Sequence, residues 1–320
     1  MSKHRAVAVE ALRKYEVAPE TVRLAAESFN SIFRVTTASA VYALRVGAML
    51  QIHPEGTAAV EAAWHRRLRE QGVFVPDVLA NVDGELATLV TDGRAEHGTR
   101  VCILFEWVTG RSLRTCMTGP RAAALGRLSA RLHQDGAVWS PSGVINVLRA
   151  DRVLYWQVPD QLAAAGSRFG FGTLFTDARA RAQSVLDALW QDPPHPPHLV
   201  HGDLTPHNVI VSPRHGLVPI DFQDTVQGFE VQDLSITISA LRRWPGSDRL
   251  VDAFRSGYCE LRAWPDVSPA LLDSLVVARG LQQMNLTLNV ADNDGLESYV
   301  AGHAERVRTW MRRPAGHDRT

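Results

Sequence analysis

The chain has 320 residues, a length that predicts two domains or two lobes. Lys plus Arg and Asp plus Glu number 34 each, and this zero formal net charge argues against nucleic acid or an anionic membrane as a dedicated partner. Hydrophobic residues make up 45% and charged residues 21%, which excludes a disordered chain and a membrane bundle. No apolar run approaches the ~18 residues of a membrane span, and the charged N-terminus predicts no signal peptide, so the cytoplasm is the expected location.

Two scarce residue types exclude further classes of protein. The only lysines are Lys3 and Lys14, so no Lys can follow the last glycine of a Walker A phosphate loop, and pyridoxal chemistry on an internal Lys is equally hard to place. Three cysteines, Cys102, Cys116 and Cys259, are scattered without C-x-x-C spacing. Neither a disulfide framework nor a structural zinc site is therefore predicted from the cysteines.

The first part of the chain reads as a short helix followed by strands in hairpin order. Residues 5–15 have helical apolar spacing, and the β-branched and aromatic segments 27–35 and 40–46 flank the polar run TTASA. A helix ending at Gly72 and two further strands, at 85–91 and 100–108, complete this part. Because its strands come in hairpin order, it cannot be a doubly wound sheet.

Helices dominate from residue 109 onward. Helical patterns cover 121–135, 178–191, 230–242, 248–262, 268–290 and 296–312, and two short strands interrupt them at 208–222. The pattern predicts an α+β architecture with a small antiparallel β lobe, residues 1–107, and a larger mainly helical lobe, residues 108–320.

The segments HLVHGDLTPHNVIVS (198–212) and VPIDFQD (218–224) carry the chemistry of the chain. Asn208 opens one short strand and Asp221 ends the next, so a hairpin can bring both oxygens to one end of a sheet. A carboxamide with a carboxylate suits Mg²⁺, which takes hard oxygen ligands together with nucleotide phosphates. Asp203 lies on the loop before the hairpin, where it could orient a substrate hydroxyl toward a γ-phosphate.

The block HGDLTPHN with the later IDF resembles the aminoglycoside phosphotransferase and choline kinase superfamily, the small-molecule relatives of protein kinases. The resemblance spans about residues 27–241 and implies the two-lobe protein-kinase-like fold. It implies that Asp203 is catalytic and that Asn208 and Asp221 bind Mg²⁺. Asp233 matches the family Asp that bonds the catalytic loop, and Leu132-His133 match a pair in the preceding helix.

The resemblance also implies a nucleotide site in the β lobe. The phosphate-covering loop would be 27–32, which includes Ser31 and lacks the glycine repeat of protein kinases. Arg45 would hold the α- and β-phosphates where many relatives use Lys, with Glu61 as its expected partner and Glu70 as the alternative. The hinge would place Phe105 beside the adenine and pair the backbone of Glu106 and Val108 with its edge.

Several residues near these motifs have a more ordinary interpretation. His201 and His207 lie close to the reactive loop, but in the resembled loop the first histidine is a packing and hydrogen-bonding residue. Trp107, Trp156 and Trp190 could cage a cationic acceptor, although packing is the commoner role of tryptophan.

We therefore predict an ATP- and Mg²⁺-dependent phosphotransferase that moves the γ-phosphate to a hydroxyl of a small molecule. The alternatives are a nucleotide-binding regulator with weak or no turnover and a protein Ser/Thr kinase of the same fold. Amino alcohols, sugars, amino acids and antibiotics are all admissible acceptors, because fold does not determine substrate. ATP versus GTP preference and oligomeric state stay open.

Overall fold

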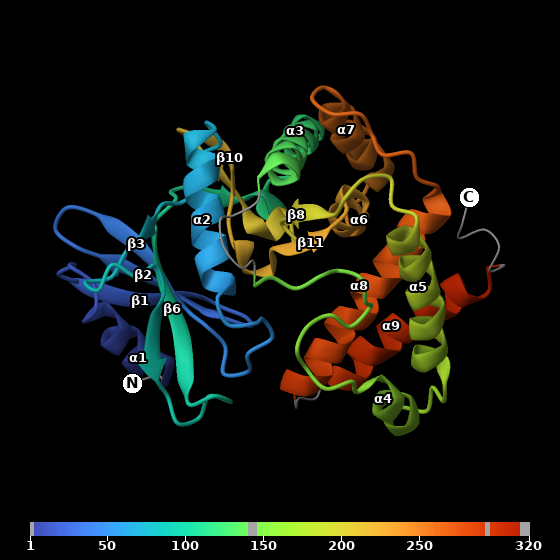
Figure 1. Ribbon diagram of the computed structural model, residues 1–320, viewed down its shortest axis with the longest axis horizontal. Helices are drawn as coiled ribbons and strands as arrows, with labels where there is room; N and C mark the ends of the chain where they lie inside the picture. Colours follow the sequence, from blue (N-terminus) through green and yellow to red (C-terminus); the bar gives the residue numbers. More distant parts are fainter. Residues whose placement is uncertain (1–2, 140–145, 292–294, 314–320) are drawn as a thin grey trace. The chain divides into compact units, whose positions relative to one another are not determined.

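The structure is a computed structural model that describes residues 3–139, 146–291 and 295–313. The chain divides into two compact units (Figure 1). The first comprises Met1–Cys116, Pro141–Asn146 and His207–Gln223, and the second comprises Met117–Ser140, Val147–Pro206 and Asp224–Thr320. The lobe boundary predicted after residue 107 stays a prediction. The segment 207–223 belongs to the same unit as the N-terminal residues.

The first unit is built on an antiparallel sheet in the order β1-β2-β3-β6-β4, with β5 also paired to β6. Its elements are α1 (Lys3–Leu12), β1 (Thr21–Glu27), β2 (Ser31–Thr36), β3 (Val41–Val46), α2 (Thr57–Glu70), β4 (Val78–Leu79), β5 (Thr88–Thr91) and β6 (Thr99–Glu106). The predicted leading helix, the hairpin of 27–46 and the helix ending near Gly72 are all present. The prediction gave no separate β1 and no two-residue β4.

Strand alternation gives the two faces of this sheet different partners. On β3 and β6 the buried Leu44, Val46, Cys102 and Leu104 join α1 in one apolar cluster. The intervening Arg45 and Phe105 face the other side, because successive side chains of a strand point to opposite faces. The helix α2 covers that side, as His65 packs against Phe105 (Figure 1). One sheet thus has an apolar face and a face that carries a buried cation.

A second small sheet explains why the segment 207–223 belongs to the first unit. It has the order β10-β9-β7, built from β7 (Arg111–Ser112), β9 (Val209–Ser212) and β10 (Gly216–Pro219), with a 3₁₀ turn at Leu113–Thr115. The backbone of Gly110 approaches β9 so closely that a Cβ there would lie 2.4 Å from Val211 O. The hairpin predicted from the sequence at 208–222 is confirmed.

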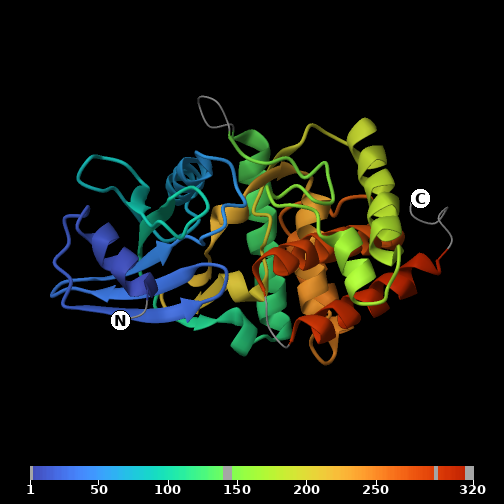
Figure 2. The same ribbon diagram turned by 90° about the horizontal axis from the view of Figure 1, so that it is seen from below.

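The second unit is mainly helical, as predicted. Its elements are α3 (Gly119–Val138), α4 (Leu162–Arg168), α5 (Leu174–Gln191), β8 (His198–Val200), β11 (Val226–Gly228), α6 (Glu230–Leu241), α7 (Ser247–Cys259), α8 (Pro269–Val290) and α9 (Leu296–Met311). One apolar cluster joins α4, α5, α6, α8 and α9, with α8 and α9 side by side (Figure 2). Ten of the twelve residues of α6 are buried, so it is the central helix of this unit.

Two glycines allow α3 and α7 to pack in close contact. A Cβ on Gly126 would lie 2.0 Å from Phe254 O, and a Cβ on Gly257 would lie 1.9 Å from Ala123 O. Side chains at these positions would force the backbones apart, so the sequence fixes a very short distance between the two helices. Among the residues that the structure describes, no helix has the length and apolarity needed to cross a membrane.

Candidate active site

A buried ion pair occupies the face of the sheet that α2 covers. Arg45 on β3 donates two hydrogen bonds to Glu61 on α2, from Nη1 to Oε1 at 2.8 Å and from Nη2 to Oε2 at 2.5 Å. Arg45 is 7% exposed and Glu61 1%. The guanidinium also lies 5.4 Å from the centre of the Phe105 ring. The geometry therefore pairs Arg45 with Glu61, and Glu70, at the exposed end of α2, is not the partner.

The same guanidinium contacts Asp221, which lies beyond the end of β10. Arg45 Nη1 donates to Asp221 Oδ1 at 3.1 Å. Burial opposes the charge of Arg45, but the carboxylates of Glu61 and then Asp221 more than offset it, so the pKa of Arg45 is raised. One cation with two carboxylates leaves the cluster with a net negative charge. That charge, together with the hard carboxylate oxygens, favours the binding of a divalent cation.

The backbone of Asp221 is held in a conformation that most residues avoid. Its φ is 61°, and no other non-glycine residue in the described parts of the chain has a positive φ. Asp tolerates this region better than most residues, yet it still costs about 1 kcal/mol or more. The next residue, Phe222, is fully buried and packs edge-on against Trp64 and His65 of α2, with ring centres 5.3 and 4.6 Å away. This anchor fixes the direction of the Asp221 carboxylate.

Asn208 lies at the same end of the β9–β10 hairpin as Asp221. It closes a 3₁₀ turn, Pro206–Asn208, directly before β9, and Val209 pairs with Pro219 across the hairpin. Ile220 N donates to Asn208 O at 2.9 Å, which continues the ladder up to the residue before Asp221. The structure thus brings these two predicted metal ligands to one end of the hairpin.

The loop between β1 and β2 is tied to the residues that follow Asp221. Asn30, 6% exposed, donates through Nδ2 to Gln223 Oε1 at 2.7 Å and accepts from Ala48 N at 3.1 Å. The sequence interpretation singled out Ser31 in this loop and missed Asn30. The hydroxyl of Ser31 lies 3.3 Å from His4 Nδ1, and its phosphate contact stays a prediction. A polar residue at the tip of a tight strand connection was the only available signal for Asn30.

Glu106 ends β6, where the hinge was predicted. Its carboxylate accepts a hydrogen bond from Arg69 at 3.0 Å, and its N–H donates to Asp77 O at 2.8 Å. Val108 lies two residues beyond the end of β6. The predicted pairing of their backbone with an adenine stays a prediction.

The second unit holds Asp203 on a loop that follows β8. Gly202 has a φ of 77°, and a Cβ there would lie 2.1 Å from Asp224 O, so only glycine fits. Gly202 N donates to Asp233 Oδ1 at 2.8 Å. Asp203 N donates to His201 Nδ1 at 3.3 Å, so the fully buried His201 supports the loop backbone, which agrees with the structural role expected for it.

Asp233 on α6 anchors this loop to α3. Its Oδ2 lies 3.0 Å from His133 Nε2, and His133 Nδ1 lies 3.1 Å from Tyr258 OH. Burial opposes the negative charge of Asp233, but His133, His201 and the N–H of Gly202 more than offset it, so the pKa of Asp233 is lowered. The family resemblance named Asp233 and His133, and the structure shows them in contact.

Arg279 on α8 is the principal residue that the sequence interpretation missed. Its Nη2 donates to Asp203 Oδ1 at 3.1 Å and to Asp224 Oδ2 at 3.4 Å, and its Nη1 donates to Tyr155 OH at 3.1 Å. Burial opposes its charge, but Tyr155, Asp203 and Asp224 offset it, so the pKa of Arg279 is raised. The available signal was a lone cation in the otherwise apolar helix segment 275–281.

Each tryptophan considered for a cation cage already has an arginine over its ring. The guanidinium carbons of Arg279, Arg149 and Arg34 lie 4.6, 4.6 and 5.5 Å from the ring centres of Trp156, Trp190 and Trp107, respectively. Internal cations thus cover a face of each ring, which weighs against the three tryptophans as a cage for a cationic acceptor.

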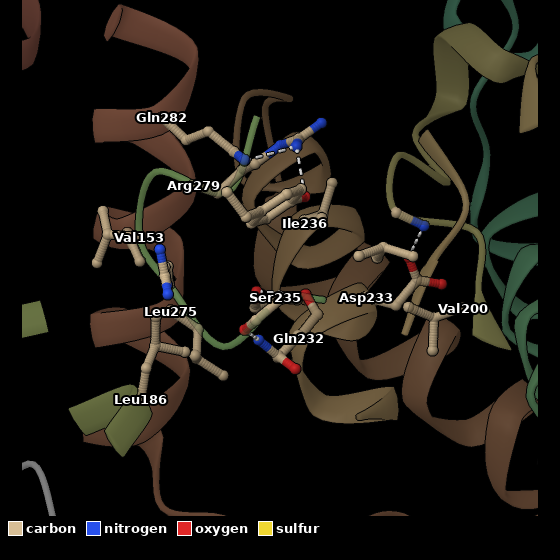
Figure 3. A pocket seen from close by; sticks show the side chains of 16 residues that line it. Val153, Leu186, Val200, Gln232, Asp233, Ser235, Ile236, Leu275, Arg279 and Gln282 are labelled. Atoms are coloured by element: carbon tan, nitrogen blue, oxygen red, sulfur yellow. Dashed lines mark hydrogen bonds between the residues drawn. The ribbon is translucent and has the colours of Figure 1, made fainter. Parts of the chain in front are cut away.

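A cavity of about 40 Å³ lies in the second unit beside Arg279 (Figure 3). Its lining is mixed, with apolar side chains such as Leu186 and Leu275 and polar ones such as Gln232 and Gln282. A water needs roughly 10–15 Å³ by this kind of measure, so the cavity has room for a few waters and not for an acceptor molecule.

The model of the phosphotransferase enzyme family matches residues 21–269. The chain belongs to this family. The predicted enzyme class, a phosphotransferase with an alcohol group as acceptor, is confirmed at the level of the family. A search of curated proteins finds no match to this phosphotransferase.

Solved structures confirm the fold of the phosphotransferase. It is 24% identical to a microcompartment-associated aminopropanol kinase, with a TM-score of 0.74 over 99% of this chain and 100% of that one. Amicoumacin kinase hAmiN is 18% identical, with a TM-score of 0.75 over 98% and 95% of the two chains. Aminoglycoside phosphotransferase APH(4)-Ia is 16% identical, with a TM-score of 0.62 over 96% and 98%. The predicted resemblance and the protein-kinase-like α+β fold are both confirmed.

Proposed function

We propose that this phosphotransferase transfers the γ-phosphate of ATP, as its Mg²⁺ complex, to a hydroxyl group of a small molecule. The single observation that carries the proposal is the buried Arg45–Glu61 pair with Asp221 on the same guanidinium, at the hairpin end that also holds Asn208. Related structures contain AMP-PNP with Ca²⁺, or ADP, which supports a nucleotide and a hard cation as the occupants of this site.

Each residue of the first unit has a distinct task in this proposal. Arg45 holds the α- and β-phosphates, and Glu61 fixes its planar head so that little conformational freedom is lost on binding. Asn208 and Asp221 are the ligands of the metal, which neutralises the charge of the phosphates when bound. Ser31, Glu106 and Val108 complete the proposed contacts of the nucleotide.

In the second unit, Asp203 accepts a hydrogen bond from the acceptor hydroxyl and orients it for attack. Arg279 holds one carboxylate oxygen of Asp203, and Gly202, bonded to Asp233, sets the course of the backbone. Such a residue contributes mainly orientation in phosphoryl transfer. A peptide acceptor is disfavoured because only residues 222–229 separate Asp221 from α6, which leaves no room for an activation segment.

The proposal is tested by measuring ADP formation from ATP with and without Mg²⁺, over a panel of amino alcohols, sugars, hydroxy amino acids and aminoglycosides. An acceptor-dependent rate that requires Mg²⁺ is expected. Asp203→Asn should lower kcat by about 10²-fold or more while nucleotide binding is kept. Asp252→Asn, an exposed carboxylate on α7, is the matched control and should leave the rate unchanged.

Direct binding separates the kinase from a regulator that only binds nucleotide. Calorimetric titration with Mg²⁺ and a non-hydrolysable ATP analogue should show binding to the wild type and to Asp203→Asn, and a large loss in Asp221→Ala. Nucleotide binding without phosphate transfer to any member of the panel would instead support the regulator. If Asp221→Ala binds Mg²⁺–nucleotide as well as the wild type, the metal site is wrong.

A further inference from the structure

The second unit holds a group of metal-ligand side chains that the proposed reaction does not use. His195 lies in the Pro-rich segment before β8, His198 begins β8 and Glu230 begins α6. His195 Nε2 lies 2.7 Å from Glu230 Oε2, and His198 Nε2 lies 3.8 Å from the same oxygen. One ligand atom from each residue lies within 4.8 Å of the others. Three donor atoms from two segments of the chain are therefore close together.

One of these atoms lacks the hydrogen bond that buried polar atoms normally make. His198 is 8% exposed and Glu230 6%, and His198 Nε2 has no hydrogen-bond partner among the described residues, whereas Glu230 Oε2 has the 2.7 Å contact with His195 Nε2. The 3.8 Å between His198 Nε2 and Glu230 Oε2 is too long for a hydrogen bond. Buried polar atoms without partners are rare in folded proteins, and a bound ion is one of the standard reasons for them.

The tautomer of His195 points to the same missing partner. Its Nδ1 lies 2.9 Å from Pro196 O, a carbonyl that can only accept, so the proton of the neutral ring is on Nδ1. The Nε2 lone pair of this tautomer would repel the carboxylate oxygen at 2.7 Å, so the contact needs either a bound cation or a second ring proton between the two atoms. A hydrogen bond from Nδ1 to a carbonyl is also the usual way in which a metal-binding histidine is oriented.

We propose that His195, His198 and Glu230 form a binding site for Zn²⁺, with ligation through His195 Nε2, His198 Nε2 and Glu230 Oε2. Two imidazoles and one carboxylate are a common zinc donor set, with ligand bonds of roughly 2.0–2.2 Å and a fourth position for water. The His195 side chain is 30% exposed, which gives an ion access from solvent. The softer imidazole donors select zinc over Mg²⁺.

Arg262 supports the carboxylate of this group. Its Nη2 donates to Glu230 Oε1 at 3.1 Å, so it orients the carboxylate and leaves Oε2 directed at the histidines. Its positive charge also opposes a bound cation, although the Arg262 side chain is 25% exposed and therefore partly screened. Removal of Arg262 changes metal affinity in two opposing ways, so the test of the site is made on the three ligands themselves.

A metal at this position would join two segments that hold the loop of Asp203. β8, which His198 begins, runs directly into Gly202, and α6, which Glu230 begins, carries the Asp233 carboxylate that accepts from Gly202 N. The proposed zinc therefore stabilises this part of the fold. It is not involved in phosphate transfer, and its binding does not depend on the proposed function.

The experiment is a calorimetric titration of chelator-treated protein with Zn²⁺, alongside Co²⁺ as a spectroscopic probe. We expect one equivalent of Zn²⁺ to bind, a tetrahedral Co²⁺ absorption spectrum, and a melting temperature higher by roughly 5 °C at saturation. His195→Gln and Glu230→Gln should each weaken binding at least ~100-fold, because each removes one ligand. Excess Mg²⁺ should not compete.

Matched variants make the result decisive. His97→Gln removes an exposed histidine and should bind Zn²⁺ like the wild type, as should Asp221→Ala, which tests the separate magnesium site. Circular dichroism tests whether each variant is folded. His195→Gln is the variant expected to disturb the fold least, because the His195 side chain is 30% exposed. Absence of Zn²⁺ binding by the wild type, or equal Zn²⁺ affinity of wild type and His195→Gln, would overturn the proposal.

Discussion

Arg279 donates a hydrogen bond from Nη2 to Oδ1 of Asp203 over 3.1 Å, although 75 residues lie between them in the chain. The guanidinium is fixed on its other sides by Tyr155, Gln282 and the ring of Trp156. Because these contacts leave it little freedom, Arg279 sets the orientation of the carboxylate that the proposed reaction uses.

Arg279→Met should lower kcat by about 10²-fold while the Kd for Mg²⁺–nucleotide changes little, because misplacement of a reacting group by about 1 Å costs this much. Steady-state kinetics and calorimetry measure the two quantities. Arg279→Lys should recover part of the rate, since a cation returns without the planar fork. Parallel losses of kcat and nucleotide affinity would show that the substitution disturbs the fold instead.

Substitution of either partner of the Arg45–Glu61 pair should destabilise the protein. Arg45→Met or Glu61→Gln should each reduce the free energy of unfolding by about 3–5 kcal/mol, because one buried charge is left without its main partner. The double variant Arg45→Met/Glu61→Leu should be more stable than Arg45→Met alone, yet neither should bind nucleotide. Urea unfolding and nucleotide titration distinguish these two roles.

The matched control for Arg45 is Arg23→Met on the exposed β1 strand, which should change neither stability nor binding by much. Nucleotide binding retained in the double variant would show that the pair serves stability only.

His303 should make the protein less stable in mild acid. Burial, followed by the charges of Arg306 and Arg243, lowers the pKa of His303 from 6.5 to about 4, and the tilted Tyr299 ring lies 4.6 Å from its ring centre. Below pH ~6.5 the histidine is protonated in the unfolded chain but stays neutral in the folded chain. The free energy of unfolding therefore decreases from pH ~6.5 to pH ~4, and below pH ~4 His303 causes no further change. The loss is roughly 3 kcal/mol in total.

The measurement is the free energy of unfolding by urea between pH 7 and pH 4 for the wild type and His303→Gln. In His303→Gln the free energy of unfolding should depend less on pH in this range than in the wild type. His97→Gln, at an exposed position, should show the same pH dependence as the wild type. Identical slopes for the wild type and His303→Gln would contradict the assignment.

Gly202→Ala should impair turnover more than nucleotide binding. The added Cβ would meet Asp224 O at 2.1 Å, and the φ of 77° is strained for alanine. The loop must shift, and Asp203 with it, so we expect a loss of kcat of about 10²-fold and a loss of 1–3 kcal/mol in stability. Gly98→Ala, which has a similar φ and open space around it, is the control for strain alone.

Local patterns in the sequence predicted the long helices and the β2–β3 and β9–β10 hairpins. Helix periodicity and strand alternation are set by neighbouring residues, so these elements could be recognised without tertiary information. Three-residue strands such as β8 and β11 carry too little pattern, and the short α4 contains a glycine within LAAAGSR. These elements depend on contacts made after the chain has folded.

The candidate site likewise contains residues that the sequence identified and residues that only the structure revealed. Asp203 and Asn208 lie in one segment and Asp221 in the next, and their residue types pointed to a metal and phosphate site. Arg45 and Glu61 were named through the family resemblance. The proximity of Asp203 to Asn208 and Asp221 stays a prediction. Arg279 and Asn30 could not be found in this way, because each acts on a partner far away in the sequence.

The assignment of residues 207–223 to the first unit limits how this enzyme can be divided. A truncated chain ending at Cys116 would leave the edge of β7 without its neighbour β9 and would remove Asp221 from the Arg45 guanidinium. Chimeras that exchange the second unit between relatives must therefore transplant its stretches on both sides of the hairpin and retain the native hairpin. A single crossover point after the N-terminal sheet would produce a mismatched protein.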